Sequence, residues 1–301
     1  MINQYKRTDV FRCNQEAHRH FDGKVSVYHV LKEKTCYPQG CLYFLWRCVL
    51  LEKGRKCIHG FGHTGRKCKG CTYYSDEKVH LQPKRLLDEG EYEVFLNDLE
   101  QYEAWLGHVQ FKRHNLLGRI QTIKPWFERT VRSGECHTHL RGYLLVFKRG
   151  FIGRESFNDT FYARVPESMM RQFRFVSRMK LEITAEIRLD RGRVVALHPG
   201  GVDILSKGWG FPWTRERALV AVRTATLFDD QPESCLACPW GCLADTVDKS
   251  ETEESRFRQL YCLKGIADSD GCYVRLERKI KKPMPLHQGN RPDEERKAHA
   301  L

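Results

Sequence analysis

The sequence has no long hydrophobic run. Its longest apolar stretch extends from Cys41 to Leu51, contains Arg47, and is too short to cross a bilayer as a helix. The first residues, MINQYKRTDVFRC, are polar and lack the apolar centre of a secretory signal. We therefore expect a soluble, cytoplasmic protein that does not enter a membrane.

Motifs of the common catalytic sites are also missing. The chain contains no glycine-rich phosphate loop, no G-x-S-x-G elbow and no H-E-x-x-H sequence. The nearest arrangement is Cys136-His137-Thr138-His139, where a thiol and an imidazole could serve as nucleophile and base, but such a group is common. No small-molecule substrate is identified, and these absences favour a protein that is not an enzyme on its own.

Acidic residues are in deficit. The chain has 38 Asp and Glu against 51 Lys and Arg, which gives a formal net charge of +13. Its hydrophobic fraction of 41% is that of a globular protein, and 301 residues suffice for two domains with a sizeable core. An excess of positive charge favours a polyanionic partner, nucleic acid first, or the acidic surface of a redox protein. A basic surface that is merely solvated is the alternative.

Cysteine, in contrast, is abundant. The chain has 13 cysteines, and this odd number would leave one thiol outside any complete set of disulfides. In a cytoplasmic protein so many cysteines indicate metal or cluster ligation rather than disulfides.

The first cysteine group lies between Cys36 and Cys71. Cys68 and Cys71 form a C-x-x-C knuckle, in which Gly70 allows the tight turn that points two sulfurs at one soft metal. The predicted ligands of this centre are Cys57, Cys68 and Cys71, joined by Cys36 or Cys41. His59 and His63 are expected beside the centre or, for zinc, among its ligands, whereas Cys48 lies in an apolar run and is left open between packing and metal binding.

The second cysteine group is Cys235-x2-Cys238-x3-Cys242, with Cys262 and Cys272 downstream. Pro239 prevents a helix after Cys238 and keeps the loop open. The predicted ligands are Cys235, Cys238, Cys242 and Cys262. Neither group has the second knuckle typical of structural zinc, so the spacing favours two [4Fe–4S] clusters over zinc.

The middle of the chain is rich in predicted strands. Segments 117–126, 142–151 and 160–165 read as strands, a short helix follows Pro166, and residues 181–189 alternate between apolar and polar. Asp190-Arg191-Gly192 then turns the chain into a strand from Val194. This order of strand, strand, strand, helix, strand, strand resembles an OB-fold, a small five-stranded barrel.

Other segments complete the predicted organisation. Residues 25–31 read as a strand, residues 91–107 as a helix ending at Gly107, and Thr214 as the cap of a helix over 215–228. The predicted class is α+β, an OB-like small β-barrel flanked by two cysteine-rich metal-binding modules. Its parts are an iron–sulfur module at 1–90, a linking helix at 91–115, the barrel at 116–210, a helix and second metal module at 211–278, and a disordered basic tail at 279–301.

Cations lie next to aromatic residues in the predicted barrel. Cations can follow a phosphate backbone while rings stack on bases, so the predicted contacts are Lys124, Trp126, Arg149, Phe151 and Arg174. The sequence thus favours a metal-centre protein that binds single-stranded nucleic acid or RNA. The alternatives are an iron–sulfur electron-transfer protein that serves a redox partner, and an RNA-associated factor with structural zinc.

Overall fold

The computed structural model describes the chain except residues 17, 19–21, 133–134, 229–230, 251–253 and 275–301. The contacts divide the chain into two units, residues 1–267 and residues 268–301. Strand exceeds helix, 43% against 24%, which confirms the predicted α+β class. In the second unit the Asp268 carboxylate accepts hydrogen bonds from the backbone amides of Asp270 and Gly271. The predicted tail at 279–301 lies outside the described residues.

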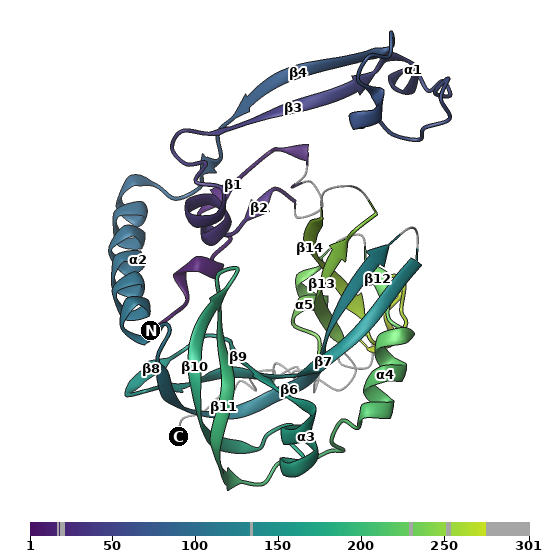
Figure 1. Cartoon of the computed structure of the whole chain (residues 1–301). Helices are drawn as coiled ribbons and strands as arrows, with labels where there is room; N and C mark the ends of the chain where they lie inside the picture. The colour runs from purple at the N-terminus through teal and green to yellow at the C-terminus, as the bar shows by residue number, and fades with distance from the viewer. Residues whose placement is uncertain (17, 19–21, 133–134, 229–230, 251–253, 275–301) are drawn as a thin grey trace, which may run out of the picture. The chain divides into compact units, whose positions relative to one another are not determined.

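Nine strands between residues 113 and 262 of the first unit form one sheet (Figure 1). Its order is β12-β14-β13-β6-β10-β11-β9-β7-β8, and β6 also pairs with β7. The strands are β6 (Arg113–Arg132), β7 (Glu135–Ile152), β8 (Glu155–Phe157), β9 (Phe161–Val165), β10 (Lys180–Asp190), β11 (Arg193–Ser206), β12 (Thr226–Phe228), β13 (Gly241–Asp248) and β14 (Ser255–Cys262).

Five of these strands are linked in a closed series of pairings. From β6 the pairings lead through β10, β11, β9 and β7 back to β6, and all are antiparallel except β9 with β11. Helix α3 (Glu167–Phe173) connects β9 to β10. The predicted order of strands and helix is confirmed, with the short β8 added between β7 and β9.

The apolar alternation in β10 explains why this strand was predictable. Leu181, Ile183, Ala185 and Ile187 are buried in the main core, while the residues between them are more exposed. The turn into β11 uses positive φ angles at Arg191 (49°) and Gly192 (78°), as the predicted Asp-Arg-Gly turn requires.

Strand β6 is long enough to belong to two regions of the sheet. Residues 113–119 pair with β10, whereas residues 128–131 pair in parallel with β13. Strands β14 and β12 continue the sheet beyond β13. The predicted Thr214 cap is confirmed, but α4 (Arg215–Arg223) ends early because Thr226–Phe228 form β12. Helix α5 (Glu233–Leu236) precedes β13.

The N-terminal residues form a three-stranded sheet of β2 (Lys24–Val25), β1 (Phe11–Arg12) and β5 (Lys84–Arg85). The predicted strand at 25–31 is wrong, because after β2 the chain forms the π-helical turn η3 (His29–Glu33). Turn η1 (Gln4–Lys6) precedes β1, and helix α2 (Glu89–Val109) begins at an Asp88 capping box. Gly107 lies inside α2, so the predicted stop there is wrong.

A two-stranded hairpin of β3 (Cys41–Cys48) and β4 (Tyr74–Leu81) carries the first cysteine group. Figure 1 shows helix α1 (Val49–Glu52) at the end of this hairpin, where a long connection containing η4 (Arg66–Cys68) joins the strands.

One apolar core joins the N-terminal residues, α2 and the sheet. It includes Phe11, Tyr102 and Phe147, which lie far apart in sequence. The rings of Phe147 and Phe161 stack 4.8 Å apart within it. The predicted boundaries at 90/91, 115/116 and 210/211 therefore lie inside the first unit, whereas the contacts place a boundary at 267/268.

Candidate functional site

The loop between β3 and β4 holds Cys57, Cys68 and Cys71. Two backbone amides point at its sulfurs: His59 N–H at Cys57 Sγ (3.4 Å) and Gly65 N–H at Cys68 Sγ (3.5 Å). Cys57 and Cys68 are therefore each in contact with a backbone amide of the same loop.

Cys48 also lies at this end of the hairpin. It pairs with Tyr74, and burial, Asp76 and Cys68 together raise the pKa of Tyr74, so Cys48 and Cys68 have a common neighbour. His63 lies beside Gly65 in the same loop. The further ligand-type side chains at this position are thus His63 and Cys48, which the sequence left open between packing and metal binding.

Cys36 and Cys41 lie at the opposite end of the hairpin. The eight residues of β3 separate Cys41 from Cys48 by about 23 Å at the usual rise of a strand. Burial, followed by the nearby thiols of Cys41 and Cys13, raises the pKa of Cys36. The structure therefore groups these two cysteines with Cys13 and not with the loop.

The second cysteine group is divided by the sheet. Cys242 pairs with Tyr261 and packs beside Phe127, while Cys262 faces the other side of the sheet. The Cys242 thiol donates to the Pro125 carbonyl at 3.1 Å, and burial raises its pKa to about 11. Cys242 is thus placed as a neutral buried thiol, apart from the other predicted ligands.

Cys235 and Cys262 remain on one side, around Phe228 and Leu260. The amide of Cys238 donates to the carbonyl of Cys235. Within the described part of the chain, no three Cys, His, Asp or Glu side chains form a group that could hold a metal ion. A metal centre in either cysteine group therefore requires its loop to close around the ion.

The predicted nucleic-acid contacts differ in their surroundings. Lys124 is only 8% exposed, and its ammonium donates to the carbonyls of Gly241 and Leu236. Trp126 is half-buried under the guanidinium of Arg164, 4.5 Å from the ring centroid. Both residues link β6 to other elements, since Lys124 reaches α5 and β13 and Trp126 contacts Arg164 of β9. The ammonium of Lys124 is therefore engaged and not exposed to a phosphate.

The other three predicted contacts are exposed. Arg149 and Phe151 lie near the end of β7, where Phe151 is 46% exposed, and Arg174 ends α3 with a φ of 48°. Lys124 pairs with Leu144, seven residues before Phe151, or about 23 Å along the strand. The structure does not gather the five predicted residues into one patch.

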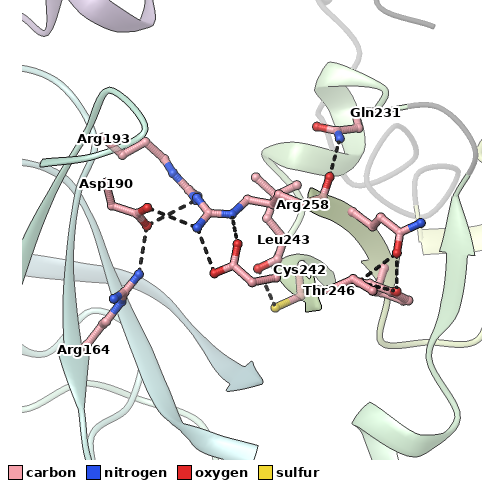
Figure 2. Close-up of polar contacts among 11 residues, drawn as sticks. Arg164, Asp190, Arg193, Gln231, Cys242, Leu243, Thr246 and Arg258 are labelled. Atoms are coloured by element: carbon pink, nitrogen blue, oxygen red, sulfur yellow. Dashed lines mark hydrogen bonds and ion pairs between the residues drawn. The ribbon is translucent and has the colours of Figure 1, made fainter. Parts of the chain in front are cut away.

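A cluster of charges joins β9–β11 to β13 and β14 (Figure 2). Arg258 donates to the carboxylates of Asp190 (3.1 Å) and Asp245 (2.8 and 3.0 Å), and Arg164 donates to Asp190 (2.8 Å). Arg193 lies 3.7 Å from Asp190. We call these five residues the arginine cluster.

The arginine cluster shifts the acidity of its members. Burial opposes ionisation of Asp190, yet Arg258, Arg193 and Arg164 outweigh burial and hold its pKa below the ordinary value. Burial and the charge of Arg258 lower the pKa of Arg193. Arg258 Nη1 is buried without a hydrogen-bond partner. The three arginine side chains of the cluster thus face the carboxylates of Asp190 and Asp245, which neutralise part of their charge.

Sequence reasoning predicted Arg174 as a contact but missed Trp209 and Phe211, two exposed rings. Arg178 lies 5.5 Å from the centroid of Trp209, which is 65% exposed, and Phe211 is 90% exposed. We call Arg174, Arg178, Trp209 and Phe211 the Trp209 platform. The run Lys207-Gly-Trp-Gly-Phe-Pro-Trp213 was the available signal, since it places rings between glycines and so lacks the periodicity of a core segment.

Comparison with known proteins gives no match: no family model, no curated protein and no solved structure is significantly similar to the chain. Among the described residues, none of the helices has both the length and the apolar character of a membrane span.

Proposed function

We propose that this protein binds single-stranded nucleic acid through an OB-like barrel of β6, β7, β9, β10 and β11. The supporting observation is the series of pairings that returns to β6, with α3 between the third and fourth of these strands. This order of strands and helix resembles that of the OB-fold, whose members bind oligonucleotides and oligosaccharides. A net charge of +13 favours the oligonucleotide.

The chemistry of the exposed residues supports the same function. The exposed side chains include two cations, Arg149 and Arg174, and one ring, Phe151. A strand of nucleic acid can contact them from solvent. Phosphate contacts supply affinity, and stacking on rings supplies a tolerant contact for bases. Lys124 is omitted because its ammonium is engaged with backbone carbonyls. Trp126 is omitted because its side chain is half-buried, with Arg164 against its ring.

The cysteine groups are proposed to hold two soft-metal centres that order their loops. Cys57, Cys68 and Cys71 serve the first, with Cys48 as fourth ligand for a [4Fe–4S] cluster or His63 for zinc. The second uses Cys235, Cys238 and Cys262. A reducing cytoplasm would keep these thiols available, which is why we assign the protein to that compartment.

Binding is tested with fluorescent dT12 and rU12 at two salt concentrations. The affinity should fall steeply with salt, since counterion release contributes much of the free energy. Absence of binding at the lower salt concentration would refute the proposed function. If the same sample were coloured and bleached by dithionite, electron transfer to a redox partner would take its place.

The metal centres are tested by iron, zinc and sulfide analysis after anaerobic purification. Cys68→Ser should lower the metal content, whereas Cys136→Ser, at an exposed cysteine in β7, should leave it unchanged. Cys242→Ser should also keep the metal, because that thiol is bonded to Pro125. Equal metal content in Cys68→Ser and Cys136→Ser would refute the first centre.

A further inference from the structure

We infer that the nucleic-acid strand binds on the Trp209 platform, with bases stacked on Trp209 and Phe211 and phosphates beside Arg174 and Arg178. This inference rests on the proposed function and names the surface that performs it. Its ligand is a single strand, because stacking on these rings needs bases that are not paired.

Two members of the platform, Arg178 and Trp209, are fixed by hydrogen bonds of their backbone. The Arg178 amide donates to the Ile120 carbonyl (2.7 Å), and the Arg119 guanidinium donates to the Arg178 carbonyl (2.8 Å), so both sides of Arg178 are fixed to β6. The Trp209 amide donates to the Ser177 carbonyl at 3.0 Å. Gly208 makes this approach possible, since a β-carbon there would collide with Ser177 and Met179. The backbone at Ser177 is thus in direct contact with the backbone at Trp209, and this contact places the ring of Trp209 under the guanidinium of Arg178.

The arginines of the platform are free to bind an anion. Neither Arg174 nor Arg178 has an ion-pair partner among the residues that the structure describes. Both have positive φ angles, 48° and 67°, a conformation that disfavours any residue with a β-carbon. A glycine would fit the backbone of these positions better, so the turns themselves do not require an arginine at either position.

One loop of the face that OB-folds commonly use is engaged within this chain. That face is formed by the second and third strands and by the loops between the first and second and between the fourth and fifth strands, and the last of these loops is here the β10–β11 turn. Asp190 at the turn is bound to Arg258 of β14. The Gly192 carbonyl accepts from Asn3, and Tyr28 lies against Gly192. Residues near both ends of the first unit thus contact the β10–β11 turn, whereas the side chains of the Trp209 platform are exposed.

The test compares variants of the full chain by fluorescence anisotropy of labelled dT12 and rU12. Trp209→Ala should lower the affinity about 5- to 150-fold, the equivalent of one lost base–ring stack, while Trp209→Phe should retain most of it. The double variant Arg174→Gly and Arg178→Gly should reduce the slope of log affinity against log salt by about 1.4. The two oligonucleotides distinguish a DNA-binding from an RNA-binding platform, and thermal melting checks that each variant is folded.

Two matched controls separate the platform from the common face. Phe44→Ala removes an exposed ring on β3 and should leave the affinity unchanged. Arg191→Gly removes an exposed arginine with positive φ from the β10–β11 turn and should also have no effect. If Arg191→Gly weakened binding while the platform variants did not, the platform would be rejected and the proposed function would stand. If wild type bound neither oligonucleotide, the function itself would fail.

Discussion

The arginine cluster and the Trp209 platform use the same side chain in opposite ways. Arg164, Arg193 and Arg258 lie between strands and face aspartates, and the Arg258 side chain is only 11% exposed. Arg174 and Arg178 lie on the surface with no carboxylate partner among the described residues. The comparison shows that the partner of an arginine, and not the density of basic residues in the sequence, separates a structural cation from one available to a ligand.

The largest change in the free energy of unfolding is expected from Arg258→Ala. This variant leaves Asp190 and Asp245 without their shared cation, so the free energy of unfolding should fall by about 3 kcal/mol, as for a broken buried ion pair. Urea titration measures the loss. Arg178→Ala is the control and should change stability by no more than about 0.5 kcal/mol, as exposed positions do. Equal losses in the two variants would abolish the distinction between the two sets.

The pH dependence of stability tests whether the charge of Asp190 stabilises the arginine cluster. Because Arg258, Arg193 and Arg164 hold the pKa of Asp190 below its ordinary value despite burial, ionised Asp190 stabilises the fold above its unfolded pKa of about 3.9. That stability is lost as the pH falls through the depressed folded pKa. The wild type should therefore exceed Asp190→Asn in stability at pH 7, and the difference should shrink below about pH 4. A difference independent of pH would show that the charge of Asp190 contributes nothing.

The smallest expected change in the free energy of unfolding is an increase. Arg174→Gly and Arg178→Gly should each raise the free energy of unfolding by about 0.5 kcal/mol, since glycine removes the cost of a positive φ but adds freedom to the unfolded chain. Arg171→Gly, at an exposed position inside α3, is the control and should lower it by about 1 kcal/mol. A loss in all three variants would mean that the platform arginines stabilise the fold.

The sequence predicted the elements whose pattern is local. The alternation in β10, the apolar spacing of α2 and the turn at Arg191-Gly192 each depend on neighbouring residues, and each was found. Strand β13 was missed because its pairing with β6 joins residues more than 100 positions apart, and β14 pairs with β13 and not with β6. The segment at 25–31 has the composition of a strand, but only Lys24 and Val25 find a partner strand.

The site was less predictable than the fold, for the same reason. Cys235, Cys238 and Cys242 are close in sequence, yet the pleat of β13 turns Cys242 to the other side of the sheet. Lys124 and Trp126 lie in a basic and aromatic run, but carbonyls from residues more than 100 positions later surround the lysine. Spacing in sequence shows which side chains are near one another, and not which way they face.

The shared strand β6 also determines the order in which the protein can be completed during synthesis. The first half of β6 finds its partners in β7 and β10, which leave the ribosome soon afterwards. Residues 128–131 wait for β13, which is made more than 100 residues later. Until then one edge of this segment has unpaired amides and carbonyls, the kind of edge that pairs with other chains. The nascent protein therefore passes through a stage in which its central strand is exposed to aggregation, and β13 ends that stage.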